Sequence, residues 1–394
     1  MDTEKSMVGK KVVILFGNLE MGGAERQGLL VARYLKELCG AVVEVWGLGP
    51  LRGPVADQCE AWGIHWRAVP LHWGLKRRFS HLLRLLFTLR SASPDLLMPY
   101  TRVPNLACGL LWRLSGCKTM LWNQADEGLL LQHSLLHRYA ISQVPHFIVN
   151  SKAAEILLTR TFGVQPSRIR FIKNGVTTGH AHVDRRQWRM MLGADEGQLV
   201  ATMLANLTSY KDHTTLISAW SRVVSYFAKT TQQQPLLVLA GRFEDTAQAL
   251  QDQIQEAGLR DSVRLIGYTD DSFGLLQASD LCVFSSRSEC YPNAILEAMQ
   301  AGLPVAASDI AGIRDTVGSD GSPWLAAPGD AETLAKCIID LAADHSLRLQ
   351  LGKLMQKRVQ SEFSERAMCQ QVGEVIFHVL NSDSVAGQPG PTGR

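Results

Sequence analysis

The chain has 394 residues, of which 46% are hydrophobic and 20% charged; this favours two globular domains and excludes a disordered or fibrous protein. The formal net charge of +3 argues against a nucleic-acid partner, because such proteins need a broad basic surface. The first apolar run, 12–16, is too short for a signal peptide, and arginines interrupt the runs at 82–89 and 106–114 before they reach membrane-span length. We therefore expect a cytoplasmic protein whose eight cysteines, which lack Cys-x-x-Cys spacing, are reduced thiols and not zinc ligands.

Short apolar runs rich in Val, Ile and Leu alternate with helix-length segments along the chain. In the first half we expect a helix at 24–38 and strands at 12–16, 41–46, 96–98, 119–122 and 147–149. In the second half we expect strands at 199–205, 236–240, 263–266, 281–284 and 305–307. This alternation is typical of parallel sheets covered by helices on both faces. The sequence therefore predicts an α/β fold with two Rossmann-like, doubly wound parallel sheets.

A polar stretch at 173–189 interrupts the periodic pattern and contains the turn-forming pair Asn174 and Gly175. We place the boundary there, which gives an amino-terminal domain at 1–175 and a carboxy-terminal domain at 176–364. A last helix is expected at 365–381, crossing back to the amino-terminal domain. Residues 382–394, rich in Gly, Pro and Ser, are expected to be a disordered tail.

Residues 72–90 combine apolar and basic side chains within one helix-length segment. The apolar residues are Leu75, Phe79, Leu82, Leu83 and Leu86, and the basic ones are Lys76, Arg77, Arg78, Arg84 and Arg90. A basic amphipathic helix can rest on anionic lipid or bind a lipid phosphate, which would make the protein peripheral on the cytoplasmic face of a membrane. The alternative is a surface helix with a solvated basic face, and the sequence leaves both open.

The strongest motif candidate runs from Ser285 to Gly302, with the sequence SSRSECYPNAILEAMQAG. It follows the expected strand at 281–284 and continues into a helix, which predicts a strand–loop–helix unit. Ligands of parallel α/β sheets bind beyond the carboxyl ends of strands, where the first amides of a helix attract phosphate. The amides expected to do so belong to Asn293, Ala294, Ile295 and Leu296.

Two carboxylates in this segment, Glu289 and Glu297, are eight positions apart. A carboxylate accepts two hydrogen bonds from vicinal hydroxyls, so one glutamate can hold a sugar and the other a ribose, on either side of a diphosphate. The spacing alone has little meaning. Its position after a strand and around a helix start makes it informative.

The segment resembles the Glu-x7-Glu motif of the retaining glycosyltransferases of family four, which have the GT-B fold of two Rossmann-like domains facing each other across a cleft. The resemblance extends over nearly the whole chain. Near the amino terminus, GNLEMGGAER at 17–26 is similar to the glycine-rich turn of the family, with Gly22 and Gly23 permitting close backbone approach to the donor. Further similar segments, in the family's order, are 174–176 (NGV), 205–213 (ANLTSYKDH) and 304–312 (PVAASDIAG).

The resemblance implies roles for individual residues in donor binding. Lys211 would neutralise the diphosphate, Glu297 would hold the ribose and Glu289 the transferred sugar, so we expect Lys211 and Glu289 to be catalytic. Many relatives carry an arginine shortly before this lysine, but positions 205–210 contain none. Arg242 is a candidate substitute, and Asn206 is a further candidate donor contact. Cys290 and Asp315 also depart from the family pattern, where glycine and glutamate are common.

The acceptor side is less well defined. The family often places a histidine in the first domain, yet residues 122–128 read WNQADEG. Asn123, Gln124, Asp126 and Glu127 are candidates for binding sugar hydroxyls, and Asp126 is our catalytic candidate for accepting the acceptor proton. An ordinary polar loop is the alternative for this segment.

We therefore expect transfer of a sugar, most simply a hexose, from a nucleotide-diphosphate sugar to a sugar or lipid-linked acceptor in polysaccharide, glycolipid or other glycoconjugate biosynthesis. The resemblance implies a retaining mechanism with neither a metal nor a cofactor other than the co-substrate. Two alternatives stay open: a catalytically silent nucleotide-sugar-binding or scaffold protein, and a nucleotide-sugar epimerase of the same fold. A Rossmann dehydrogenase is disfavoured because no Gly-x-Gly-x-x-Gly follows the first strand.

Overall fold

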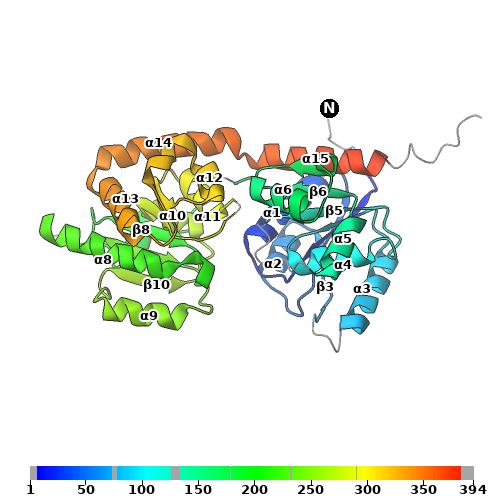
Figure 1. Cartoon of the computed structure of the whole chain (residues 1–394), viewed down its shortest axis with the longest axis horizontal. Coiled ribbons are helices and arrows are strands. Elements are labelled where there is room, and N and C mark those ends of the chain that lie inside the picture. Colours follow the sequence, from blue (N-terminus) through cyan, green and yellow to red (C-terminus); the bar gives the residue numbers. More distant parts are fainter. Residues whose placement is uncertain are drawn as a thin grey trace, which may run out of the picture. The chain divides into compact units, whose positions relative to one another are not determined.

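The computed structural model describes residues 7–72, 78–125, 134–177, 179–230, 233–289 and 291–382. The chain divides into two compact units (Figure 1). Unit 1 consists of residues 1–175 and 365–394, and unit 2 of residues 176–364. The last helix, α15 (Glu365–Ser382), belongs to unit 1 although it follows all of unit 2 in the sequence.

Unit 1 is built on a seven-stranded sheet, counted over the described residues, in which every neighbouring pair of strands is parallel. Its strands are β1 (Lys11–Phe16), β2 (Val42–Gly47), β3 (His65–Ala68), β4 (Leu96–Pro99), β5 (Thr119–Gln124), β6 (His146–Val149) and β7 (Ile169–Phe171). The strand order is β3-β2-β1-β4-β5-β6-β7. Residues 12–16 of β1 are all fully buried, as expected for a central strand with helices on both faces.

Helices cover both faces of the unit 1 sheet. They are α1 (Gly23–Glu37), α2 (Pro54–Ala61), α3 (Arg78–Ala92), α4 (Arg102–Leu111), α5 (Leu135–Gln143), α6 (Lys152–Ile156) and α15, with short helical turns at Leu157–Thr161 and Pro166–Arg168. Residues of α1, α2 and α15 share one buried cluster with the sheet. Residues of α3, α4 and α5 share a second cluster, which contains the alternate side chains of the same strands. The two groups of helices therefore lie on opposite faces.

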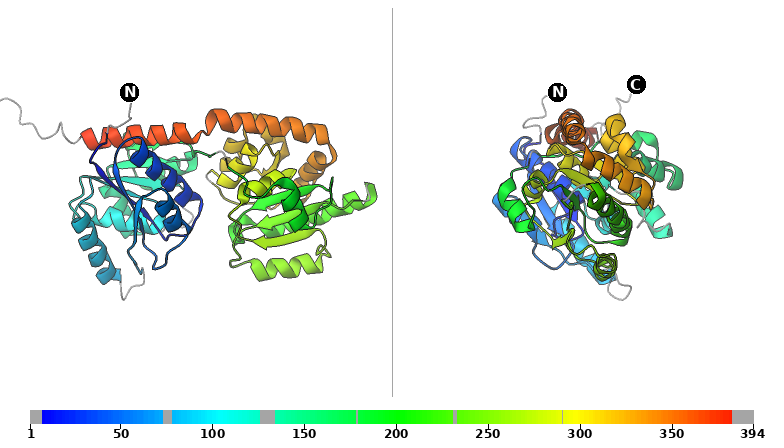
Figure 2. Two further views of the ribbon diagram at one scale, coloured as in Figure 1. Left: turned by 180° about the vertical axis from the view of Figure 1, so that it is seen from behind. Right: turned by 90° about the vertical axis from the view of Figure 1, so that its left-hand side faces the viewer.

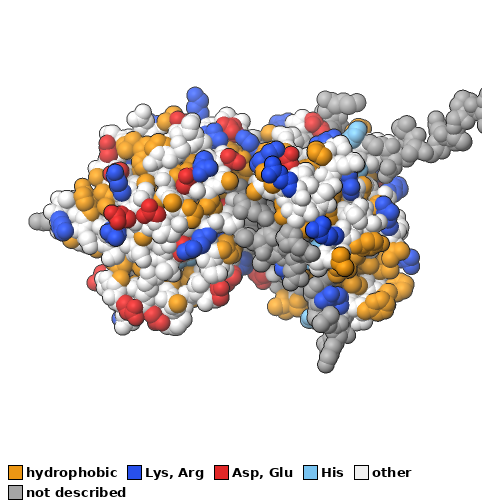
Figure 3. All heavy atoms as spheres, viewed as in Figure 1, with side chains coloured by type: hydrophobic (Ala, Val, Ile, Leu, Met, Phe, Trp, Pro, Cys, Tyr) orange, Lys and Arg blue, Asp and Glu red, His pale blue; other side chains and the backbone are white. Residues whose placement is uncertain are grey.

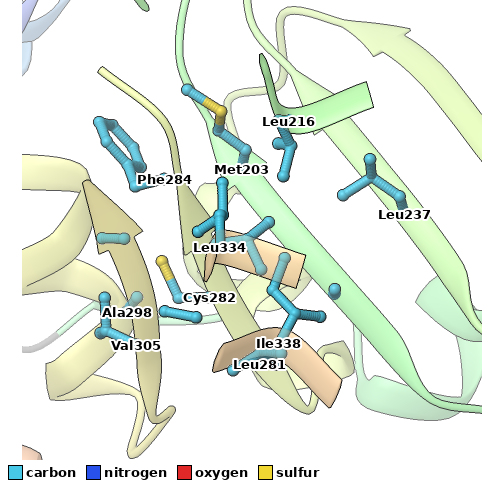
Figure 4. Close-up of a cluster of buried hydrophobic side chains, with 14 of the residues drawn as sticks. Met203, Leu216, Leu237, Leu281, Cys282, Phe284, Ala298, Val305, Leu334 and Ile338 are labelled. Atoms are coloured by element: carbon cyan, nitrogen blue, oxygen red, sulfur yellow. The ribbon is translucent and has the colours of Figure 1, made fainter. Parts of the chain in front are cut away.

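Unit 2 contains a six-stranded parallel sheet within the part of the chain that the structure describes. Its strands are β8 (Val200–Leu204), β9 (Leu236–Ala240), β10 (Val263–Gly267), β11 (Leu281–Phe284), β12 (Val305–Ser308) and β13 (Leu325–Ala326). Its helices are α7 (Arg185–Leu192), α8 (His213–Thr230), α9 (Ala247–Glu256), α10 (Ser272–Ala278), α11 (Asn293–Gln300), α12 (Ala311–Gly321), α13 (Ala331–Ala343) and α14 (His345–Glu362). Figure 4 shows side chains of β8, β9, β11 and β12 packed with those of α8, α11 and α13 in its core.

The two sheets share one strand-order pattern. Unit 2 has the order β10-β9-β8-β11-β12-β13, so in both units the first strand lies beside the fourth, and the order reverses between them. This reversal is the topological switch point at which open α/β sheets bind ligands beyond the carboxyl ends of their strands. The switch points are therefore β1/β4 in unit 1 and β8/β11 in unit 2.

The chain passes from one unit to the other after Gly175 and again after Ser364. Contacts within each unit hold the residues that flank these two positions. In unit 1, the side-chain amide of Gln27 donates to the Gly175 carbonyl over 2.8 Å and accepts from its amide over 3.0 Å. A β-carbon added at Gly175 would lie 2.7 Å from the Cα of Glu365, so glycine permits this close approach. In unit 2, the Val176 amide donates to the Phe363 carbonyl over 2.9 Å.

Three strands were not expected from the sequence: β3, β7 and β13. They are short, and β3 and β7 have polar or partly exposed side chains, so they lack the continuous apolar run that marks a buried strand. The expected helix at 72–90 is observed as α3, which begins at Arg78 and ends at Ala92; residues 73–77 lie outside the described residues. No helix in the described ranges is long and apolar enough to cross a membrane.

Candidate active site

Lys211 lies at the switch point of unit 2, in the turn after β8. Lys211 ends a short 3-10 turn, Ser209–Lys211, and Asp212 adopts a left-handed conformation with φ of +52°, so α8 begins at His213. The Asp212 carboxylate then accepts from the Thr215 hydroxyl over 2.8 Å, which fixes the first turn of α8.

Glu289 follows β11, the neighbouring strand at the same switch point, and it forms an ion pair with Lys211. The Ser286 hydroxyl donates to the same carboxylate oxygen of Glu289 over 2.9 Å. Only 15% of the Lys211 side chain and 13% of the Glu289 side chain are exposed, so the pair is largely shielded from water. The structure thus brings together two predicted site residues that are 78 positions apart in the sequence.

The Lys211 ammonium also lies over two aromatic rings. Its nitrogen is 5.2 Å from the ring centre of Tyr210 and 5.3 Å from that of Phe284, the last residue of β11. Aromatic faces attract a cation, and a partly desolvated site strengthens this attraction. The positive charge of Lys211 is therefore held at the strand ends by a carboxylate and two rings.

Arg287 is a residue that sequence analysis missed. Its guanidinium Nε donates to Asp212 over 2.9 Å, and its amide donates to the Tyr210 carbonyl over 2.9 Å. Ser285 adds a third link, because its hydroxyl donates to the Lys211 carbonyl over 3.0 Å. These bonds connect the loop after β11 to the turn after β8. They also place a second cation, Arg287, near Lys211. The sequence has no arginine at positions 205–210, where the resemblance to family four led us to expect one.

Arg242 and Asn206 lie after β9 and β8 and are joined to each other. The Asn206 side chain accepts from the Arg242 amide over 3.1 Å and donates to Glu244 over 2.8 Å. The Arg242 guanidinium lies 5.8 Å from the centre of the Tyr268 ring. Both candidates are thus at the strand-end edge of unit 2.

The start of α11 differs in detail from the expectation that four successive amides meet a phosphate. The amides of Ile295 and Leu296 both donate to the Pro292 carbonyl, over 3.0 and 3.1 Å, because regular helix bonding begins there. Asn293 and Ala294 occupy the first two positions of the helix. The backbone amides at these positions have no carbonyl acceptor within the helix. Glu297, half-buried one turn further, accepts from the Ser272 hydroxyl of α10 over 3.4 Å.

His213, next to Asp212, is buried and only 2% exposed. Neither of its ring nitrogens has a hydrogen-bond partner among the described residues. Burial first, and then the nearby charge of Lys211, lower the pKa of His213 to about 4, so the ring is neutral at pH 7. A neutral ring adds no positive charge to the site, which leaves the charge to Lys211 and Arg287.

At the switch point of unit 1, Gly22 and Gly23 form the start of α1. Gly22 has φ of −138°, an extended conformation that other residues also adopt, so its backbone does not require glycine. A β-carbon at Gly22 would lie 2.6 Å from a carboxylate oxygen of Glu25, a flexible side chain of the same turn. In the loop after β4, the neighbouring strand, Thr101 has φ of +67°, a strained conformation that the sequence did not reveal.

The strand expected at 119–122 continues through Asn123 and Gln124 as β5, so the alternative of an ordinary polar loop is wrong for these two residues. Asn123 is 5% exposed, and its side chain donates to the Pro99 carbonyl over 3.1 Å. Gln124 is 3% exposed and accepts from the Trp122 indole over 2.9 Å. The side-chain amides of both residues therefore form hydrogen bonds within the sheet. Asp126, Glu127 and Cys290 lie outside the described residues.

No cluster of His, Cys, Asp or Glu with the geometry of a metal site occurs in the described segments. The seven cysteines described are buried thiols outside any disulfide, and burial raises the pKa of the Cys59 thiol to about 12. A thiol with such a pKa is a poor nucleophile at neutral pH.

The fold is that of the GT-B glycosyltransferases. The Anabaena protein HepE in complex with UDP and glucose superposes with a TM-score of 0.79 at 20% identity, covering 93% of this chain and 99% of that one. A sucrose-phosphate synthase from Thermosynechococcus elongatus gives a TM-score of 0.75 at 19% identity, covering 95% of this chain and 100% of that one. At these identities the similarity shows the fold alone.

Two family models match successive parts of the sequence. Residues 21–180 match Glycosyltransferase Family 4, and residues 184–358 match Glycosyl transferases group 1. The first range covers the turn with Gly22 and Gly23, and the second covers Lys211, Glu289 and Glu297. The chain belongs to glycosyltransferase family 4.

Curated relatives align with about half of the chain. The N-acetyl-alpha-D-glucosaminyl L-malate synthase of Bacillus anthracis is 24% identical over 200 residues, 51% of this chain and 51% of the relative. The lipopolysaccharide core biosynthesis glycosyltransferase LpsE of Rhizobium meliloti is 29% identical over 201 residues, 51% of this chain and 55% of the relative. The chain thus matches only about half the length of these relatives.

Proposed function

We propose that this protein is a retaining glycosyltransferase that binds a nucleotide-diphosphate sugar at the β8/β11 switch point of unit 2. The observation that carries the proposal is the shielded pair of Lys211 and Glu289, a cation for the diphosphate beside a carboxylate for sugar hydroxyls. A bound donor would exchange this internal ion pair for two separate sets of contacts: phosphate oxygens on Lys211 and hydroxyl groups on Glu289. Asn293 and Ala294 of α11 and the carboxylate of Glu297 complete the proposed donor site.

In the proposed reaction, the bond between the anomeric carbon and the diphosphate oxygen breaks while the acceptor hydroxyl attacks from the same face. The negative charge that develops on the departing diphosphate meets Lys211 and the first amides of α11, which are already oriented before reaction. The acceptor proton goes to a base that we assign, from its position after β5, to Asp126. No metal enters this proposal, because Lys211 supplies the positive charge.

The donor and acceptor are proposed only by class. The HepE complex contains UDP and glucose, and the relatives act in lipopolysaccharide core biosynthesis or form an N-acetylglucosaminyl malate. These names support a hexose donor, and a sugar or lipid-linked acceptor in polysaccharide or glycoconjugate biosynthesis in the cytoplasm. Arg242 and Asn206 are proposed as outer donor contacts, at the same edge of the sheet.

The test combines donor titration with a transfer assay. UDP, GDP and their sugars are titrated calorimetrically into the parent and into Lys211→Gln and Glu289→Gln, and products with an acceptor panel are identified by mass spectrometry. Loss of a charge-assisted contact at Lys211 should weaken donor binding roughly tenfold to a hundredfold and reduce transfer by at least as much. Glu289→Gln should weaken the nucleotide sugar more than the bare nucleotide.

The exposed residues Lys229 and Glu256 provide matched controls, because each is the same residue type on the surface of unit 2. Lys229→Gln and Glu256→Gln should leave binding and transfer unchanged. Donor binding without turnover across the whole panel would identify a silent binding protein, and acceptor-independent release of an epimer would identify an epimerase. Unchanged donor affinity in both site variants would refute the site assignment.

A further inference from the structure

Helices α3, α4 and α5 cover the same face of the unit 1 sheet. Leu85 of α3, Leu111 of α4 and Ile141 of α5 are buried in one cluster with that sheet, and α4 packs against both of its neighbours. Since the inner sides of all three helices meet the sheet, their outer sides together form one surface of unit 1 (Figures 1 and 2). We call it the α3–α5 surface.

On α3 the outer side is apolar. Phe79 is 75% exposed, Leu83 37% and Phe87 62%. Their spacing of four residues places them in one stripe along the helix, while Leu85 and Leu89 on the other side are fully buried. A surface helix of a globular protein usually has a polar outer side, so α3 has more exposed apolar area than packing against the sheet explains.

The two other helices extend the apolar area. Leu135 and Tyr139 of α5 are 85% and 58% exposed, and Leu114, just beyond α4, is 56% exposed. The Arg90 guanidinium of α3 donates to the Leu114 carbonyl over 2.8 Å, so the end of α4 adjoins α3. Figure 3 shows hydrophobic side chains gathered over this part of unit 1. Exposed apolar areas of this kind usually mark a binding surface.

The charge of the α3–α5 surface has one sign. The three helices contain no Asp or Glu, and their basic residues are Arg78, Arg84, Arg90, Arg102 and Arg138. The helices on the opposite face of the same sheet have mixed charge. Their acidic residues are Glu25, Glu37, Asp57, Glu60, Glu365 and Glu374, and their basic residues are Arg26, Arg33, Lys36 and Arg366. A further helix on the α3–α5 side of the sheet, α6, contains Lys152 and Glu155, which pair with each other, so the excess basic charge of this side lies on α3, α4 and α5.

We propose that the α3–α5 surface docks on an anionic lipid membrane. Phe79, Leu83 and Phe87 enter the boundary between headgroups and acyl chains, and the arginines bind lipid phosphates. A second copy of this chain fits less well, because a symmetric contact would place two arginine-only surfaces against each other. The proposal is independent of sugar transfer, because neither donor nor acceptor takes part in the docking.

The test is sedimentation of the full chain with phosphatidylcholine vesicles, with and without phosphatidylglycerol. The parent should bind the anionic vesicles, more weakly as salt is raised, and should bind pure phosphatidylcholine far less. The variant F79S/F87S should bind the anionic vesicles at least roughly tenfold more weakly, because it loses the inserting rings. Arg84→Glu, which reverses one exposed charge, should also cost roughly tenfold or more.

Helix α7 of unit 2 supplies matched controls. Met190 and Met191 are 74% and 58% exposed, and Arg186 is exposed on the same helix. M190S/M191S and Arg186→Glu should bind vesicles as the parent does. If F79S/F87S does not fold, as judged by circular dichroism and Tm, the Arg84→Glu comparison still decides the question.

Three results would overturn the proposal. The first is equal vesicle binding by the parent, F79S/F87S and Arg84→Glu. The second is parent binding to neutral vesicles that equals its binding to anionic ones, or no binding to either. The third is a vesicle-free dimer in sedimentation velocity that F79S/F87S converts to a monomer, which would assign the surface to self-association.

Discussion

The switch points of the two units have the same strand order but contain different chemistry. In unit 2, Lys211, Asp212, Arg287 and Glu289 come from two loops and are joined by ion pairs and hydrogen bonds. In unit 1, the corresponding loops contribute two glycines and Thr101, with its positive φ. A shared topology therefore provides the location of a site, whereas the loops decide which ligand it suits.

The difference extends to how each unit uses its buried polar groups. Asn123 and Gln124 of unit 1 bond the sheet around them and stabilise the fold. His213 of unit 2 is buried without a hydrogen-bond partner among the described residues, directly beside the charged site. We expect Asn123 and Gln124 to stabilise unit 1, and we expect the buried ring of His213 to lower the stability of unit 2. Three predictions test this comparison.

The largest effect is expected from the pH dependence of unit 2. Burial and Lys211 lower the pKa of His213 from 6.5 to about 4, so the unfolded chain gains a proton below pH 6.5 before the folded chain does. Stability should therefore fall as pH decreases from about 6.5 to 4, by up to about 3 kcal/mol, and be unaffected above this range. Urea unfolding at several pH values measures it.

His213→Leu should flatten this dependence, because no proton can then be gained. The exposed His180 of the same unit provides the control, and His180→Gln should retain the slope of the parent. An unchanged slope in His213→Leu would mean that other groups control the acid sensitivity, and that His213 does not distinguish the two units.

The second effect concerns unit 1. Asn123→Ala should lower the free energy of unfolding by about 2 kcal/mol, because it leaves buried carbonyls of β4 and β5 without their donor. Donor binding in unit 2 should not change. Asn381→Ala, at an exposed position of α15, is the control and should have little effect on stability. If Asn123→Ala instead impaired acceptor affinity with normal stability, the assignment of Asn123 to the sheet would fail.

The smallest effect is expected at Thr101. Thr101→Gly should raise the free energy of unfolding by about 1 kcal/mol, because glycine adopts a positive φ without strain. Transfer activity should fall if the strained threonine positions the acceptor or the donor at the unit 1 switch point. Higher stability with unchanged kcat and KM would show that the strain has no function.

Much of the fold follows from the sequence because its signal is local. The apolar run at 281–284 and the helix after Pro292 are observed as β11 and α11, since a buried parallel strand and an apolar helix face are both visible within a few residues. The short strands β3 and β13 were missed, because pairing with neighbouring strands stabilises them more than their own composition does.

The same division applies to the site. The nucleotide-sugar site at Lys211, Glu289 and Glu297 was predicted from the resemblance to family four, and it stays a prediction. The sequence by itself indicated the strand–loop–helix unit that contains Glu289 and Glu297, because that pattern is local. Only the tertiary structure decided that Lys211 pairs with Glu289, that Arg287 joins the site through Asp212, and that Asn123 and Gln124 are buried in β5. These outcomes depend on contacts between residues far apart in the sequence, and no local pattern encodes them.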